Sequence, residues 1–118
     1  MTLGRILIYT RKMEEMEAFY CSHFGFRAHR NEGDRIVELR PEGQGTAILL
    51  HPAGKGQKIG QVLVKLVFDV EDVEGFVARA KGEGLVFGPL HRGEGYVFAN
   101  AKDPSGNPIS VSGRFVAG

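Results

Sequence analysis

The order of hydrophobic and polar positions repeats along this chain, and the two copies begin sixty positions apart, at residues 5 and 65. In each copy a short apolar run (5–10 and 65–70) leads directly into a segment whose apolar residues recur every three or four positions (13–20 and 73–80). The first pattern is typical of a strand and the second of an amphipathic helix. A repeat of this kind predicts two copies of one structural unit.

Further strand-like runs follow each predicted helix. Glycines are expected to end the two helices, at Gly25 and within 82–84, as glycine does where a left-handed residue is needed. The predicted strands are 26–31, 35–40 and 46–51 in the first half, and 85–87, 96–102 and 108–112 in the second. Turn-forming residues separate them, including Asp-Pro-Ser-Gly-Asn at 103–107, which favours a tight hairpin turn. The predicted fold class is α+β, with two βαβββ modules.

The domain organisation follows from the length of 118 residues, which suits one ordinary domain or two halves sharing a core. We expect a single domain over 1–118, made of a module at 1–53 and a module at 61–118. The segment 54–60 is rich in glycine and poor in apolar residues, as a linker is.

Charge and composition exclude several classes of partner. Fifteen Lys and Arg against fourteen Asp and Glu leave a net charge of +1 without a basic cluster, so no nucleic acid is expected to bind. No apolar segment has the roughly 18 residues of a membrane helix, so no membrane partner is expected. Cys21 is the single cysteine, which excludes an intrachain disulfide and is compatible with the cytoplasm.

The order of these motifs resembles a known family. Ala18-Phe19-Tyr20 ends the first predicted helix, Gly25-Phe26 follows it, and the 103–107 pentapeptide precedes the last strand. Together with the repeat, over about residues 3–113, the chain resembles the glyoxalase, bleomycin-resistance and ring-cleaving dioxygenase superfamily, also called the vicinal oxygen chelate (VOC) superfamily. The resemblance implies two modules whose mixed sheets curl around a shared ligand cavity, commonly completed in a homodimer.

The resemblance also implies where a metal would be held. In metal-dependent members, four side chains from the first and last strands of the two modules bind a divalent cation, and they are typically His, Gln or Glu. The corresponding positions here fall on Arg5, Leu49, Lys65 and Ser110. Arg and Lys only donate hydrogen bonds and are cationic, and Leu has no lone pair. We therefore expect no metal and no other cofactor.

Strand alternation assigns the side chains that face the implied cavity. If Arg5 faces the cavity, then Ile6 and Ile8 pack beneath the helices. In the same way, if Lys65 faces the cavity, Val67 faces it too. The ligand-binding residues predicted in this way are Arg5, Leu7, Tyr9, Glu38, Leu49, His51, Lys65, Val67 and Ser110.

Two questions about this site stay open at the level of sequence. Arg5 and Lys65 are either neutralised by an internal acid, Glu38 or Asp69, or they clamp an anionic ligand. The leading hypothesis is a metal-free homodimer that binds or sequesters a small, anionic organic ligand. The alternative is a glyoxalase-type lyase or isomerase, or a dioxygenase-related enzyme, with an atypical site. In that case His51 and Glu38 are the candidate catalytic residues.

Overall fold

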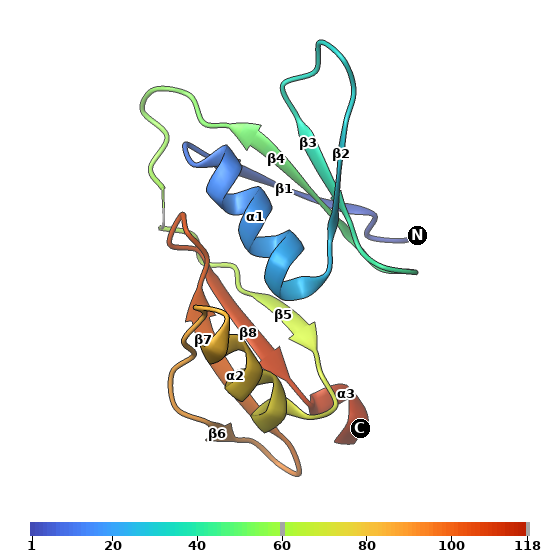
Figure 1. The fold of residues 1–118 in the computed structure, drawn as a ribbon, viewed down its shortest axis with the longest axis vertical. Coiled ribbons are helices and arrows are strands. Elements are labelled where there is room, and N and C mark those ends of the chain that lie inside the picture. Colours follow the sequence, from blue (N-terminus) through green and yellow to red (C-terminus); the bar gives the residue numbers. More distant parts are fainter. Residues whose placement is uncertain (60, 118) are drawn as a thin grey trace. The chain divides into compact units, whose positions relative to one another are not determined.

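The first half of the chain forms one helix packed on a four-stranded sheet (Figure 1). The computed structural model describes residues 1–59 and 61–117, with side chains through residue 115. The elements of this half are β1 (Arg5–Thr10), α1 (Met13–Phe24), β2 (Arg27–Arg30), β3 (Val37–Arg40) and β4 (Ala47–Pro52). The strand order is β1-β4-β3-β2, with β1 and β4 parallel and the other pairs antiparallel.

The second half repeats this topology. Its elements are β5 (Leu66–Asp69), α2 (Val73–Gly82), β6 (His91–Arg92), β7 (Val97–Lys102), β8 (Pro108–Ser112) and a short helix, α3 (Arg114–Ala117). The strand order is β5-β8-β7-β6, again with one parallel pair, β5 and β8. The predicted α+β class and the two βαβββ units are thus confirmed.

The chain divides into two compact units, residues 1–59 and 60–118. Within the segment predicted to be a linker, the Gln57 amide donates to the Gly54 carbonyl and closes a turn. The last residue of that predicted linker, Gly60, and the last residue of the second predicted module, Gly118, lie outside the described residues.

Each sheet buries the face that its helix covers. In the first unit, Met16 and Tyr20 of α1 are buried, together with Leu39 of β3 and Leu50 of β4. In the second unit the corresponding positions include Val73, Ala80, Ala99, Ile109 and Val111. Because alternate strand residues point to opposite faces, the residues between these core positions lie on the other face of each sheet. Those opposite faces carry the residues predicted to bind a ligand.

One predicted strand is wrong. Residues 85–87 form no strand, and β6 at His91–Arg92 is the edge strand that pairs with β7. Leu85 and Phe87 are buried, and the Leu85 amide donates to the Ala80 carbonyl at the end of α2. The alternation of Leu85 and Phe87 therefore reflects packing of the helix exit into the core rather than strand pairing.

Other boundaries shift by a few residues. The strand expected from 35 begins at Val37, because the Asp34 carboxylate accepts the Ile36 amide and holds a turn there. The strand expected from 65 begins at Leu66, so Lys65 immediately precedes β5. Gly25 ends α1 with a φ of 73°, as predicted. The helix α3 was not expected. No helix in the described residues combines the length and apolar character needed to cross a bilayer.

Candidate functional site

The side chains of the first sheet that point away from α1 form a surface that we call the first open face. The strand register places Arg5, Leu7 and Tyr9 beside Ala47, Leu49 and His51, and Glu38 beside Leu49. Leu7 and Tyr9 are exposed, whereas Ile6 and Ile8 are half-buried. The alternation predicted for β1 is therefore present, and six predicted site residues share this face: Arg5, Leu7, Tyr9, Glu38, Leu49 and His51.

One end of the first open face is charged. The Arg40 Nε donates a hydrogen bond to Glu38 Oε2 at 3.0 Å, while the Arg5 Nε lies 3.8 Å from Glu38 Oε1. The contact between Arg5 and Glu38 is an ion pair, because 3.8 Å is too long for a hydrogen bond. Glu38 is thus the internal acid near Arg5, and it is shared between two guanidinium groups. The Arg5 side chain is 61% exposed, and its N–H groups donate no hydrogen bond to any described residue.

This arrangement weakens Glu38 as a general base. The hydrogen bond from Arg40 lowers the pKa of the Glu38 carboxyl below its ordinary value, and the charges of Arg40, Arg5 and His29 act in the same direction. Partial burial opposes them. A base with a lowered pKa removes protons less effectively near neutral pH. Glu38 is also in register with Leu49, two residues before His51, so the two catalytic candidates occupy different rows of the sheet.

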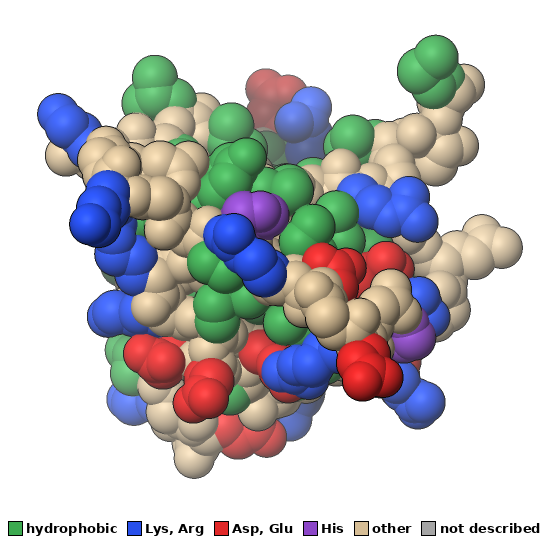
Figure 2. Space-filling view, turned by 90° about the horizontal axis from the view of Figure 1, so that it is seen from above, with side chains coloured by type: hydrophobic (Ala, Val, Ile, Leu, Met, Phe, Trp, Pro, Cys, Tyr) green, Lys and Arg blue, Asp and Glu red, His purple; other side chains and the backbone are tan. Residues whose placement is uncertain are grey.

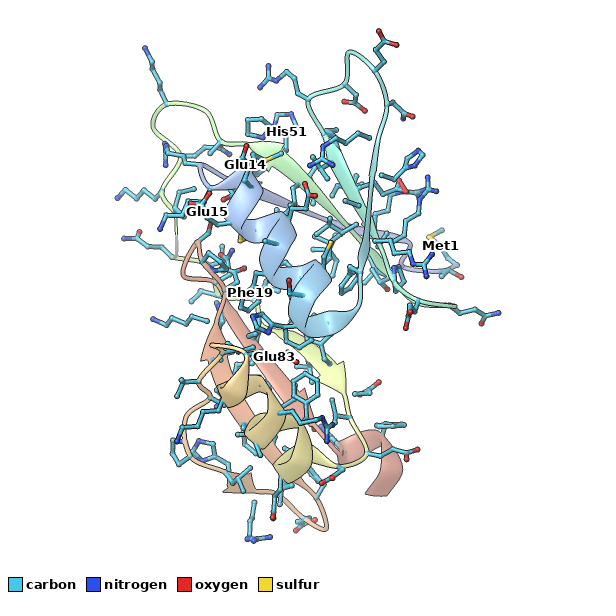
Figure 3. All side chains as sticks on the ribbon, viewed as in Figure 1. Met1, Glu14, Glu15, Phe19, His51 and Glu83 are labelled. Atoms are coloured by element: carbon cyan, nitrogen blue, oxygen red, sulfur yellow. The ribbon has the colours of Figure 1, made fainter. Side chains whose placement is uncertain are left out.

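The other end of the first open face is formed by Tyr9 and His51, which are direct partners across β1 and β4. Figure 3 shows His51 on β4 at the end of the strand. The two rings meet edge to face with centroids 5.2 Å apart. His51 Nδ1 lies 2.8 Å from the Pro52 carbonyl oxygen. A carbonyl only accepts, so Nδ1 carries the hydrogen and, in the neutral ring, Nε2 is an acceptor.

A small hollow lies at the charged end of the first open face. Its volume is about 160 Å³. The residues that line it are Arg5, His29, Asn31, Asp34, Ile36, Glu38 and Leu49. Pockets that enclose a whole drug-sized molecule have volumes of roughly 300–1,000 Å³, so this hollow has room for one polar end group of such a ligand.

The second unit has an equivalent surface, the second open face, formed by the side chains that point away from α2. Val67 is 56% exposed there, beside Ser110, which is only 3% exposed. Lys65 Nζ donates to Asn100 Oδ1 at 2.9 Å, and Asn100 is the register partner of Ser110. The predicted residues Lys65, Val67 and Ser110 therefore gather on one surface. The hydrogen-bond partner of Lys65 is a neutral amide, not Asp69.

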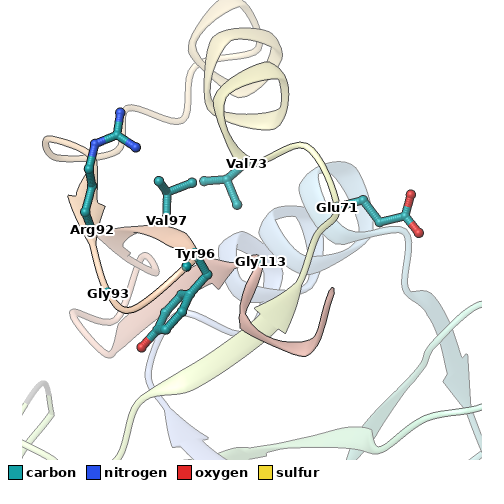
Figure 4. Close-up of a pocket in the computed structure, with 8 residues that line it drawn as sticks. Glu71, Val73, Arg92, Gly93, Tyr96, Val97 and Gly113 are labelled. Atoms are coloured by element: carbon teal, nitrogen blue, oxygen red, sulfur yellow. The ribbon is translucent and has the colours of Figure 1, made fainter. Parts of the chain in front are cut away.

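A larger hollow of about 630 Å³ lies elsewhere in the second unit (Figure 4). Val73 of α2 and Val97 of β7 line it and are turned toward each other. The Glu71 and Arg92 side chains lie on opposite sides of the hollow. Tyr96, Gly93, Gly95 and Gly113 complete the lining. None of these residues was predicted as a site residue.

The surface of the molecule also carries apolar side chains. Figure 2 shows hydrophobic side chains gathered around a histidine, with acidic and basic groups at their margin. The exposed large apolar residues include Leu7, Tyr9 and Val67 of the two open faces. An apolar middle with a few polar groups is the usual character of small-molecule sites.

The residues at the family's metal positions do not fit a divalent ion. Arg5, Leu49 and Lys65 offer no lone pair to a cation, and the Ser110 hydroxyl lies 3.4 Å from the Val111 carbonyl as a weak donor. Among the described residues, no three His, Cys, Asp or Glu side chains are grouped so as to hold an ion. Cys21 is equally unsuited to nucleophilic chemistry, because burial raises the pKa of its thiol.

Three polar residues of these surfaces were not among the predicted site residues. His29 is the register partner of Glu38 across β2 and β3, Arg40 hydrogen-bonds Glu38 from two residues further along β3, and Asn100 of β7 accepts a hydrogen bond from Lys65. The alternation along 35–40 does place Arg40 on the face of Glu38. For His29 and Asn100 the necessary information is the register between strands, which local sequence does not contain.

The protein consists of two βαβββ units, each with one open face. Comparison with known protein families identifies the superfamily to which it belongs. The family profile described as Glyoxalase/Bleomycin resistance protein/Dioxygenase superfamily matches residues 2–111. The chain belongs to this superfamily.

Individual relatives are more distant. The chain is 26% identical over 110 residues to the uncharacterized protein YetH of Bacillus subtilis (strain 168), covering 89% of this chain and 92% of that protein. The crystal structure of TnmS3, an antibiotic binding protein from Streptomyces sp. CB03234, is similar with a TM-score of 0.78 and 20% identity, covering 94% and 93%. Lactoylglutathione lyase from Agrobacterium tumefaciens is similar with a TM-score of 0.74 and 20% identity, covering 94% and 92%. At such identities the structures share the fold.

Proposed function

We propose that this chain is a metal-free binding protein for a small, anionic organic molecule. The observation that carries the proposal is the first open face, where an apolar middle ends at the exposed Arg5 guanidinium, whose N–H groups donate no hydrogen bond to the residues that the structure describes. The proposed ligand-binding residues are Arg5, Leu7, Tyr9, Glu38, Leu49, His51, Lys65, Val67 and Ser110.

The geometry of Arg5 supports an anion as the ligand. Arg5 and Arg40 share one carboxylate, Glu38, and Asp34, which lines the same hollow, offsets the remaining positive charge. Arg40 hydrogen-bonds that carboxylate, whereas Arg5 does not. A free guanidinium fork matches the geometry of a carboxylate, with two parallel N–H···O bonds. Arg5 is therefore the proposed anion contact.

The chemistry of the family's metal positions favours binding over metal-dependent catalysis. Superfamily folds host many functions, so function has to be argued from the site itself. TnmS3 is an antibiotic binding protein, which is compatible with the present proposal, whereas the lyase shares the fold but is named for a reaction. With non-ligating residues at Arg5, Leu49 and Lys65, and with Glu38 tied to Arg40, we assign no reaction to this chain.

Two further properties belong to the same proposal. We infer that the protein acts as a homodimer in the cytoplasm, following the superfamily's common assembly and the single, half-buried Cys21. Sedimentation equilibrium checks the dimer, and a monomer at high protein concentration would contradict it.

The test of the proposed function is thermal stabilisation by organic acids. Benzoate, 1-naphthylacetate and cholate are the probes, and benzyl alcohol is the uncharged comparison. A ligand that binds only the native state raises the melting temperature with its concentration. We expect at least one acid to do so and Arg5→Ala to abolish most of the shift, while Lys65→Ala tests whether the second open face takes part in binding.

The control for this test is Lys55→Ala, which removes the same charge from an exposed position in the predicted linker segment 54–60. It should respond to the acids as the unchanged protein does. If none of the acids shifts the melting temperature, or if the Arg5 and Lys65 variants respond fully, the binding proposal fails.

A further inference from the structure

The two ends of the first open face differ in the hydrogen-bonding groups that they present. At one end, Nε2 of neutral His51 accepts, because Nδ1 donates to the Pro52 carbonyl. At the other end, Arg5 can only donate, and within the described part of the chain its N–H groups make no hydrogen bond. A ligand that spans the face therefore has to bring a donor to His51 and an acceptor to Arg5.

The distance between these ends restricts the size of the ligand. Tyr9, the partner of His51, is four residues from Arg5 on the same strand. At about 3.3 Å per residue, the two rows are roughly 13 Å apart along β1. The Leu7 and Leu49 pair lies between them. The ligand that fits is elongated, with its polar groups at opposite ends and an apolar body between them.

The shape and composition of the middle favour a flat aromatic body. Tyr9 is 46% exposed, and the edge-to-face contact of its ring with His51 holds both rings at the acceptor end. Aromatic rings pack favourably against such rings in offset or edge-to-face arrangements. The hollow of 160 Å³ beside Arg5 accommodates only the acidic end group, so the aromatic body lies along Leu7 and Tyr9.

Each of the two acids near Arg5 has one carboxylate oxygen engaged by a donor other than Arg5. Glu38 is held by Arg40 through the 3.0 Å hydrogen bond. The Asp34 carboxylate accepts the Ile36 amide within its own turn. Their negative charges weaken the purely electrostatic attraction of an anion to Arg5. Binding of a carboxylate therefore depends on the two parallel hydrogen bonds that a guanidinium can donate to it.

We propose that the ligand of the first open face is an elongated hydroxyaryl acid, whose hydroxyl donates to His51 Nε2 and whose carboxylate binds Arg5. His51 is then the residue that selects ligands with a donor group. The inference rests on the proposed function, since it names the ligand class of the same site.

Matched probes test the donor end. 6-Hydroxy-2-naphthoate carries both groups, whereas 6-methoxy-2-naphthoate keeps the acid and the rings but cannot donate. We expect the hydroxy acid to bind about tenfold more tightly by isothermal titration calorimetry, as one hydrogen bond allows. His51→Leu should remove this preference, and Arg5→Ala should weaken both probes. His91→Leu, which changes an exposed histidine of the second unit, should keep the preference.

A spectroscopic readout tests the tautomer without a mutation. Two-bond ¹H–¹⁵N correlation spectra of the free protein should show the His51 hydrogen on Nδ1, with Nε2 unprotonated, at a pH where the ring is neutral. Finding the hydrogen on Nε2 would overturn the inference even if His51→Leu failed to fold.

The remaining outcomes separate this inference from the proposed function. Equal affinities of the hydroxy and methoxy acids would overturn the hydroxyaryl assignment, while binding that Arg5→Ala weakens would leave the proposed function standing. If neither naphthoate binds but benzoate or cholate still stabilises the protein through Arg5, again only the inference fails. If no acid binds at all, both fail.

Discussion

Replacing Asp103 by alanine should lower the free energy of unfolding by about 3 kcal/mol or more, measured by urea denaturation. Asp103 is 4% exposed and lies in the turn between β7 and β8. Its Oδ1 accepts the amides of Ser105 and Asn107, and its Oδ2 accepts the Asn107 side-chain amide. Alanine would leave three donors in a buried turn without this carboxylate, and each buried donor left without a partner costs about 1–3 kcal/mol.

Asp34→Ala is the matched control for this effect. Asp34 also accepts a backbone amide two residues ahead, but its turn is exposed and it makes a single hydrogen bond, to Ile36. Water can replace that bond, so the expected loss is below about 1 kcal/mol. Asp103→Asn keeps one acceptor oxygen and should fall between the two. Equal losses for Asp103→Ala and Asp34→Ala would show that the buried turn does not stabilise the second unit.

Leu50→Ala should cost about 2–5 kcal/mol, the usual range for a fully buried leucine, because it removes methyl groups and leaves a cavity. Leu50 is fully buried in β4, between its register partners Ile8 and Val37. The neighbouring Leu49 has the same side chain but lies on the first open face and is half-buried. Leu49→Ala should therefore lower the free energy of unfolding by less than about 1 kcal/mol.

This pair of leucines distinguishes the two faces of β4 within one strand. Urea denaturation of both variants measures the difference in their free energies of unfolding. Calorimetry with an organic acid that binds the protein measures the difference in their affinities for it. Leu49→Ala should weaken ligand binding while leaving the protein stable. A loss of stability for Leu49→Ala as large as that for Leu50→Ala would contradict the assignment of Leu49 to the ligand-facing surface.

The sequence was informative where a local pattern reflects a single physical cause. Alternation along 5–10 gave the two faces of β1 correctly, because Ile6 and Ile8 lie under the helix side and Leu7 and Tyr9 on the open side. Gly25 marked the end of α1, because only glycine adopts a φ of 73° without strain. The run 85–87 was misleading, since burial alone produced an alternation that strand pairing usually explains.

The candidate site was less accessible from sequence, because its character depends on partners that are distant along the chain. Arg5 reaches Glu38 only through the register of β1, β4 and β3. The Lys65 hydrogen bond to Asn100 joins residues 35 positions apart. The tautomer of His51 depends on a single carbonyl contact, with Pro52, that the residue types do not reveal.

The metal content of the purified protein tests the proposed metal-free binding role most directly. Elemental analysis by inductively coupled plasma mass spectrometry, after purification without chelator, should find divalent metal well below one ion per chain. The reason is that Arg5, Leu49 and Lys65 cannot ligate a cation at the superfamily's metal positions. One tightly held divalent ion per chain, retained through dialysis, would contradict the metal-free role and return the enzymatic alternative to first place.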